Sequence, residues 1–197
     1  MTGVSVMVCG NDTLSTFSEP ANRELVLSAD CPVSKLSGVY LWYFRSVPAG
    51  VPITGCVQSE GYHLLYAGIS PATPNSRQTL HSRIRNHFRG NAEGSTLRRT
   101  LGVLLQGTSG HALRRVGSGQ PITLTKPGEA WLSNWLAANA LVCWREHLAP
   151  WELEVELLRT YSLPLNIQGN DHHAFHSTLR RIRAEALKTA RELPIWS

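Results

Sequence analysis

The sequence predicts a mixed α/β (α+β) fold, in which a small central antiparallel sheet of about three strands is flanked by helices. Three short runs rich in β-branched and aromatic residues, at 37–45, 62–69 and 141–146, indicate the strands. Apolar residues that recur every three or four positions between and after these runs indicate amphipathic helices. A chain of 197 residues, 42% of them hydrophobic, is long enough to bury a core without disulfides.

The first third of the chain contains an extension and the first two strands. Residues 1–35 have an irregular pattern, so we expect an N-terminal extension there, with short strands at 4–8 and 24–27. The run at 37–45 is apolar and aromatic throughout, as a buried strand should be. Prolines and glycines in the following residues, 46–60, predict a loop or hairpin excursion before the second strand.

Helices dominate the middle of the chain. After the second strand, the four-residue spacing of Leu80, Ile84 and Phe88 predicts a helix over residues 76–88. A second, shorter helix is expected at 95–106, with Ser95 or Thr96 as its cap. The Gly-rich segment that follows has a short apolar and basic run that suits a hairpin. We interpret residues 89–126 as an inserted subdomain.

The last third alternates helix, strand and helices. A proline near the first turn and an early glutamate predict a helix over residues 127–139, directly before the third strand. Another helix is expected from Pro150 to about Tyr161. A polar, His-rich loop at 169–176 then leads into a basic amphipathic helix from about Phe175 to Glu192. We assign residues 171–197 to a C-terminal segment that contains this basic helix.

Composition favours a partner with phosphate groups and gives no sign of a membrane segment. The net charge is +5 and the isoelectric point about 9.3, and arginine, whose planar fork suits phosphate oxygens, predominates among the basic residues. The four cysteines are scattered without a C-x-x-C pair, which argues against structural zinc and a disulfide framework. We see no signal peptide and no apolar stretch long enough to span a bilayer, so we expect a cytoplasmic protein.

Six residues carry the functional prediction. Tyr40 and Tyr66 lie in the tripeptides Gly-Val-Tyr and Tyr-Ala-Gly of the first two strands; the others are Arg83, His87, Glu154 and Asn166. Taken singly, each has an ordinary explanation as a core aromatic, a solvated helix residue or a turn residue. Together they provide phenols, a guanidinium, an imidazole and a carboxylate, which are the groups that metal-assisted cleavage of a phosphodiester needs.

The order and spacing of these residues resemble the GIY-YIG endonucleases. The resemblance covers roughly residues 36–167, and we expect the nuclease domain to span 36–170 with the insert at 89–126. One departure is Ala67, where the family usually has Ile or Val. Because neighbouring strand residues alternate between faces, its side chain should point away from the tyrosines and into core.

The resemblance implies a role for each residue and a metal cofactor. Glu154 would bind Mg²⁺ (or Mn²⁺), Arg83 would stabilise the transition state, and Tyr40 would be the general base with His87 as its helper. Tyr66 would orient water or phosphate, and Asn166 would fix the geometry of the site. The substrate would be DNA, and double-strand cutting would need a homodimer or two successive events. The alternative is a catalytically inactive nucleic-acid-binding module on the same scaffold.

Two basic or polar clusters have less definite interpretations. Arginine runs are usually solvated, but on a nuclease scaffold Arg98, Arg99 and Arg180 become candidate contacts to the DNA backbone. The histidines His172, His173 and His176 follow one another closely, yet no second spaced pair of ligands accompanies them. We therefore favour a surface loop or a phosphate contact there over a metal site.

Overall fold

The computed structural model describes residues 13–73 and 76–196, and its centre is an antiparallel sheet with the strand order β2-β3-β1-β6. The central strands β1 (Gly38–Phe44) and β3 (Tyr62–Ser70) pair with each other, and β6 (Ala140–Glu146) pairs with the other edge of β1. The predicted three-stranded sheet is therefore wrong by one strand. The fourth, β2 (Gln58–Ser59), is too short to leave a pattern in the sequence, and a Glu60-Gly61 turn with positive φ at both residues joins it to β3.

Seven helices and one 3₁₀ turn accompany the sheet in the described part of the chain. They are η1 (Thr13–Thr16), α1 (Arg23–Leu27), α2 (Leu80–Arg89), α3 (Thr96–Leu104), α4 (Gln106–Ser109), α5 (Lys126–Asn139), α6 (Pro150–Thr160) and α7 (His176–Glu192).

The N-terminal extension differs from expectation. The strand predicted at 24–27 is wrong, because these residues belong to α1, whose cap Asn22 accepts a hydrogen bond from the Leu25 amide. The strand predicted at 4–8 lies outside the described residues. The extension is also attached to the sheet, since the Ala21 and Val142 backbones form two hydrogen bonds across an antiparallel bridge.

Helix α2 begins later than its apolar pattern suggested. Thr79 is the cap: its hydroxyl accepts from the Ser82 amide, and the Ser82 hydroxyl accepts from the Thr79 amide. This reciprocal pair satisfies two backbone donors and sets the first turn of the helix at Leu80. The start of the helix determines which of its later side chains face the sheet.

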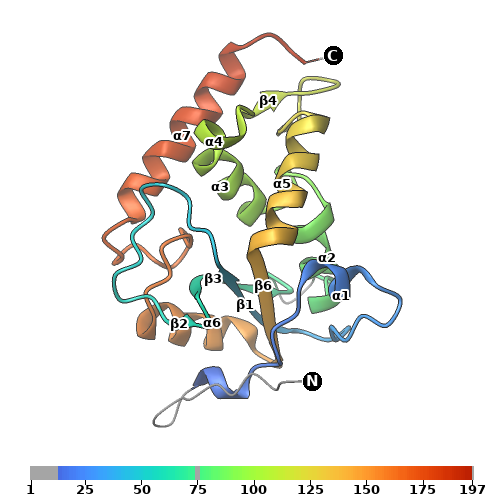
Figure 1. Cartoon of the computed structure of the whole chain (residues 1–197), viewed down its shortest axis with the longest axis vertical. Coiled ribbons are helices and arrows are strands. Elements are labelled where there is room, and N and C mark those ends of the chain that lie inside the picture. The colour runs from blue at the N-terminus through green and yellow to red at the C-terminus, as the bar shows by residue number, and fades with distance from the viewer. Residues whose placement is uncertain (1–12, 74–75, 197) are drawn as a thin grey trace.

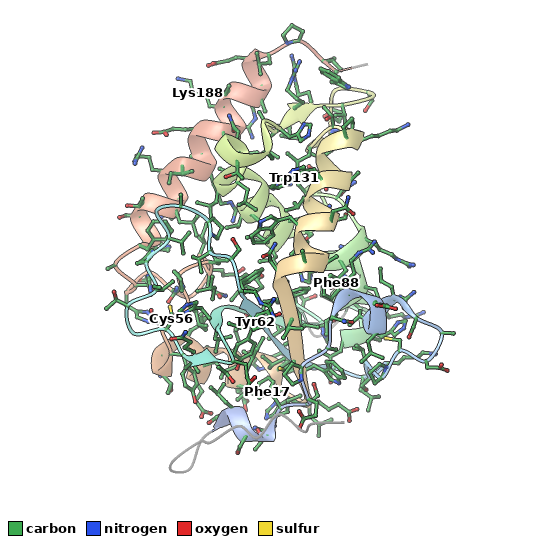
Figure 2. The ribbon with its side chains drawn as sticks, viewed as in Figure 1. Phe17, Cys56, Tyr62, Phe88, Trp131 and Lys188 are labelled. Atoms are coloured by element: carbon green, nitrogen blue, oxygen red, sulfur yellow. The ribbon has the colours of Figure 1, made fainter. Side chains whose placement is uncertain are left out.

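The two faces of the sheet bury separate groups of apolar residues. One face, which includes Val39, Leu41 and Ala67, packs against Leu153 and Leu157 of α6. The opposite face belongs to the larger core, which also includes residues of α2, α3 and α5. Figure 1 shows α6 below the sheet and α3, α5 and α7 above it, and Figure 2 shows side chains filling the space between these layers.

The segment predicted as an insert forms α3, α4 and a small hairpin of β4 (Arg114–Arg115) and β5 (Ile122–Thr123). Helix α7 crosses this segment, packing against α3 and against both hairpin strands (Figure 1). The expected hairpin is thus present, and the C-terminal helix covers it. No helix in the described residues is long and apolar enough to cross a membrane.

Candidate active site

The register of β1 and β3 brings the two motif tyrosines to the same face of the sheet. Tyr40 is paired with Gly68, and Trp42, two residues further along β1, is paired with Tyr66. Both tyrosines belong to the larger core and are almost fully buried. Ala67, between them, packs on the opposite face against α6, as the alternation of the strand required.

Gly38 and Gly68 lie where neighbouring atoms leave no space for a Cβ atom. A Cβ on Gly68 would lie 2.5 Å from the hydroxyl oxygen of Tyr40, because the phenol ring lies directly over this glycine. A Cβ on Gly38 would collide with the Arg145 carbonyl of β6 and come within 2.7 Å of Leu80. Neither glycine has a positive φ, so close approach is the reason for both.

Helix α2 brings two side chains to the Tyr40 hydroxyl. His87 Nε2 lies 2.8 Å from this oxygen, and Arg83 Nε donates to it in a longer bond of 3.4 Å. Residues four apart on a helix lie one above the other, which lets both reach one atom. The Gly94 carbonyl accepts a further hydrogen bond from Arg83 Nη1 at 3.0 Å, so the guanidinium is held at both ends.

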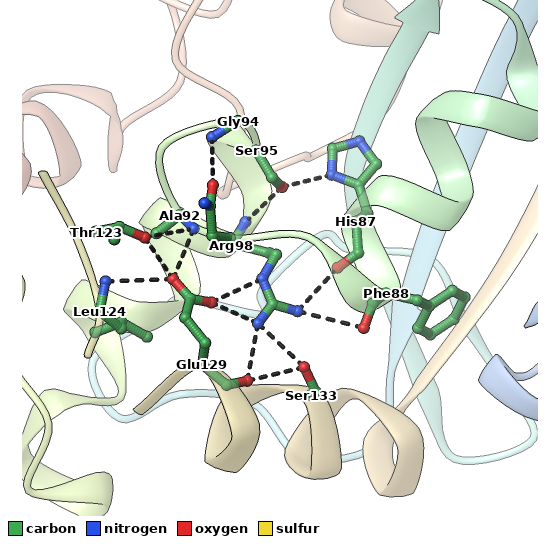
Figure 3. A network of polar contacts seen from close by, with 11 residues as sticks. His87, Phe88, Ala92, Gly94, Ser95, Arg98, Thr123, Leu124, Glu129 and Ser133 are labelled. Atoms are coloured by element: carbon green, nitrogen blue, oxygen red, sulfur yellow. Dashed lines mark hydrogen bonds and ion pairs between the residues drawn. The ribbon is translucent and has the colours of Figure 1, made fainter. Parts of the chain in front are cut away.

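His87 is fully buried between Tyr40 and the cap of α3. Its Nδ1 lies 2.7 Å from Oγ of Ser95, and this oxygen also accepts from the Arg98 amide as the helix cap (Figure 3). Burial, reinforced by the charges of Arg83 and Arg98, holds the pKa of His87 well below its usual range. The imidazole is therefore neutral, and the hydrogen bonds allow either ring nitrogen to carry its single proton.

Arg98, a candidate DNA contact from the sequence, is instead fully buried in the protein. Its guanidinium donates to the Glu129 carboxylate, at 2.6 Å for the shorter bond, and to the His87 and Phe88 carbonyls at the end of α2 (Figure 3). The Glu129 carboxylate also accepts from the Ala92 amide and the Thr123 hydroxyl. Because Arg98 has no exposed surface, it cannot contact DNA in this structure, and the expected DNA contact is corrected. Arg98 instead joins α2, α3 and α5.

Glu154 is the acidic residue beside the tyrosines. Its carboxylate on α6 is half-buried and has no hydrogen bond or ion pair to any described residue. Burial raises the pKa of this carboxyl to about 7. The charge of Glu154 raises the pKa of Tyr40 and of Tyr66, so all three groups share one electrostatic environment.

The donor set suits a weakly held magnesium ion. Magnesium is commonly bound by one or two carboxylates and keeps several waters. A half-buried carboxylate without a cationic partner fits that pattern, and in the described chain no group of three or more His, Cys, Asp or Glu residues forms a closed metal cage. Glu154 is the residue here that would hold such an ion.

The side chain of Asn166 binds the backbone of Ala67, the middle residue of the second motif. Its side-chain amide donates to the Ala67 carbonyl at 2.8 Å, and its side-chain oxygen accepts from the Ala67 amide at 2.9 Å. These bonds satisfy the Ala67 backbone groups on the edge of β3, beyond the two residues of that strand that pair with β2. A hydrogen bond from the Leu165 amide to the Leu65 carbonyl extends the same attachment.

The two phenols are poor acids in this state. Burial is the largest influence and raises the pKa of both Tyr40 and Tyr66, in the case of Tyr66 well above its ordinary value. The positive charge of Arg83 acts in the opposite direction on both groups, and its hydrogen bond lowers the pKa of Tyr40 further. Arg83 thus opposes the effect of burial on both phenols, and the charge of Arg183 also lowers the pKa of Tyr66.

The hydrogen bonds described at the Tyr40 hydroxyl involve none of the other sequence candidates. Arg99 is partly exposed and pairs with Glu93 at 3.0 Å, whereas Arg180 is exposed on α7. In the His-rich loop, His172 contacts the Leu158 carbonyl and His173 contacts the Ser162 hydroxyl. These contacts attach the loop to the end of α6.

Sequence reasoning missed the partner of His87. It recognised Ser95 as a helix cap, and the structure adds that the capping oxygen also contacts the imidazole. The capping pattern is local and visible in a sequence. A contact across the loop between two helices leaves no such pattern, so only the structure could have revealed it.

Comparison with known families agrees with this geometry. Arg83 and His87 meet at the Tyr40 hydroxyl on a small antiparallel sheet. A model of the GIY-YIG catalytic domain matches residues 38–185, which is most of the chain and extends into α7. The protein belongs to the GIY-YIG family. Neither the comparison with curated proteins nor that with solved structures gave a match.

Proposed function

We propose that this protein is a metal-dependent endonuclease that hydrolyses phosphodiester bonds in DNA. The observation that carries the proposal is the Tyr40 hydroxyl, which receives Arg83 and His87 from one helix while the charge of Glu154 reaches it from another. A phenol held by an imidazole and a guanidinium, beside an unpaired carboxylate, suits general-base attack of water on a phosphate.

In this reaction Tyr40 takes a proton from the attacking water. A free phenol titrates near about 10 and is a weak base at neutral pH, so it needs an acceptor for its own proton. His87 Nε2, at 2.8 Å, is that acceptor when Nδ1 carries the imidazole proton and donates it to Ser95. We propose this tautomer, because it leaves a lone pair of the Tyr40 oxygen free to accept from water.

The remaining residues position and stabilise the substrate. Arg83 faces the negative charge that develops on the phosphoryl oxygens, and Tyr66 orients the phosphate or the water. Asn166 keeps Ala67, and with it Tyr66, in register with β1. Magnesium or manganese bound at Glu154 would polarise the scissile phosphate and stabilise the leaving oxygen.

The proposal is tested by incubating the purified protein with supercoiled plasmid and Mg²⁺. We expect nicked circles from the wild type and at least a hundredfold slower nicking by Glu154→Ala. The matched control is Glu156→Ala, which removes an exposed carboxylate two residues away on the same helix. If the wild type nicks none of several plasmids with any divalent metal but still binds them, the chain is an inactive binding module.

A further inference from the structure

Arg183, on the C-terminal helix, lies outside the six motif residues but close to them. Helix α7 packs against α3, and Arg183 Nη1 donates a hydrogen bond of 3.2 Å to Oγ1 of Thr100, a buried residue of α3. Arg183 itself is only partly exposed. Thr100 accepts from one nitrogen of the guanidinium, so most of its donors remain available.

The surroundings of Arg183 contain positive charge and a phenol. Burial lowers the pKa of Arg183, and the neighbouring charge of Arg99 lowers it further, whereas Tyr66 acts in the opposite direction. In the described chain, the ion pairs join carboxylates to Arg98, Arg99, Arg181 and Lys188, and Arg183 is in none of them. Glu93 pairs with Arg99 and leaves Arg183 without a carboxylate partner among the described residues, and a half-buried cation without an anionic partner is unfavourable.

Tyr66 is the group that relates Arg183 to the catalytic centre. The pKa values of both Arg83 and Arg183 respond to Tyr66, and that of Arg83 responds to Tyr40 as well. Arg83 is hydrogen-bonded to the Tyr40 hydroxyl, whereas Arg183 of α7 is hydrogen-bonded to Thr100 and acts on Tyr66 through its charge. Two guanidiniums on different helices, both within electrostatic range of one tyrosine, match a substrate that carries phosphates at regular intervals.

We propose that Arg183 binds a DNA backbone phosphate next to the scissile one, with Thr100 orienting its guanidinium. This inference rests on the proposed nuclease function, because the ligand is the same substrate. It assigns to α7 a role in substrate binding. The planar fork of arginine holds phosphate oxygens in two parallel hydrogen bonds, which a lysine at this position would not reproduce.

The experiment measures duplex DNA binding by fluorescence anisotropy in EDTA, where nothing is cut, over a series of salt concentrations. The variants are Arg183→Ala, Arg183→Lys and Thr100→Val. The control is Arg191→Ala, which removes the same charge from an exposed position on the same helix. Thermal unfolding of each variant establishes that it is folded, and plasmid nicking with Mg²⁺ is measured in parallel.

We expect Arg183→Ala to weaken binding about tenfold and to reduce the salt slope by about 0.9, the contribution of one phosphate contact. Arg183→Lys should retain most of the slope but lose affinity, and Thr100→Val should weaken binding about threefold. In cleavage, Arg183→Ala should raise KM more than it lowers kcat.

Two other results are distinguishable. If Arg183→Ala binds with wild-type affinity and slope while the wild type cuts plasmid, the role of Arg183 is overturned and the nuclease function stands. If the wild type neither binds nor cuts DNA, both proposals fail together. An equal loss for Arg191→Ala would show that only net charge matters, and would also overturn the assignment.

Discussion

The position of the Tyr40 hydroxyl depends on a residue without a side chain. Gly68 lies under the phenol ring of Tyr40, and the hydroxyl of this ring contacts Arg83 and His87. The glycine of the second motif is therefore a spatial requirement of the tyrosine of the first. This relation explains why the two tripeptides belong together, although they are far apart in the sequence.

Gly68→Ala should separate activity from folding. The added methyl group displaces the Tyr40 ring and breaks its 2.8 Å contact with His87, so we expect nicking to slow about a hundredfold. Stability should fall by about 1–3 kcal/mol. Gly107→Ala, where an added Cβ meets nothing within 4 Å, is the control and should cut normally. Wild-type cutting by Gly68→Ala would contradict this explanation.

The burial of Glu154 makes stability depend on pH in a defined direction. Its pKa is about 7 in the folded protein against 4.5 in the reference state, so the folded state retains a proton that the unfolded state has lost between these values. This contribution to stability is complete below pH 4.5 and is lost as the pH rises to about 7. This shift in the pKa of Glu154 corresponds to at most about 3 kcal/mol in the free energy of unfolding.

Urea unfolding in EDTA between pH 4.5 and 8 measures this effect as a difference between wild type and Glu154→Gln. We expect the free energy of unfolding of the wild type, relative to that of Glu154→Gln, to decline as the pH rises to 7 and to stay constant above pH 7. His87, whose pKa is lowered, destabilises the folded state as the pH falls below 6.5, but it is present in both proteins and cancels. A difference that is independent of pH would contradict the burial of Glu154.

At the scale of residues, spacing predicts the candidate site but not the contacts that support it. The sequence predicts that Tyr40, Arg83 and His87 act together, and the structure joins them by hydrogen bonds. Arg98 looked like an exposed charge because its partner, Glu129, lies on a different helix. A contact between distant segments has no signature in a single sequence.

At the scale of elements, Arg98 joins α3 to α5 through its ion pair with Glu129 and to α2 through two backbone carbonyls. Arg98 lies on α3, Glu129 lies on α5, and the carbonyls that Arg98 binds end the helix that carries His87. Helix α3 therefore supports the position of His87 through the backbone at the end of α2. Ser95, at the start of α3, contributes the direct contact.

Arg98→Met should be strongly destabilising. The substitution leaves the Glu129 carboxylate without its cation, which typically costs about 3–5 kcal/mol for a buried pair. Arg99→Met, which breaks the more exposed pair with Glu93, should cost about 1 kcal/mol or less. Chemical denaturation of both variants measures the difference. Equal losses of stability in the two variants would show that the buried ion pair stabilises the fold no more than the exposed one.

Elements with long patterns could be predicted, and short ones could not. The strands β1, β3 and β6 and the helices α5, α6 and α7 agree with the expected ranges to within a few residues. The two-residue strand β2 is defined by its pairing with β3. Helix α1 is only five residues long, and its short apolar run suited a strand.

At the scale of the whole molecule, the site lies where separate parts of the chain meet. The sheet supplies the tyrosines, α2 the arginine and histidine, and α6 the carboxylate. Arg183 of α7, which is hydrogen-bonded to Thr100 of α3, acts on Tyr66 through its charge. The family match also runs through these parts into α7. We therefore propose that the insert and the C-terminal helix are parts of the DNA-binding surface.

The central claim is that the Tyr40 hydroxyl is the general base, and Tyr40→Phe tests it most directly. The measurement is the single-turnover rate of plasmid nicking in Mg²⁺, with Tyr62→Phe, the same change in β3, as the control. We expect Tyr40→Phe to remain folded and bind DNA but to cut at least about a hundredfold more slowly, and Tyr62→Phe to cut normally. Nicking by Tyr40→Phe at the wild-type rate would contradict the account.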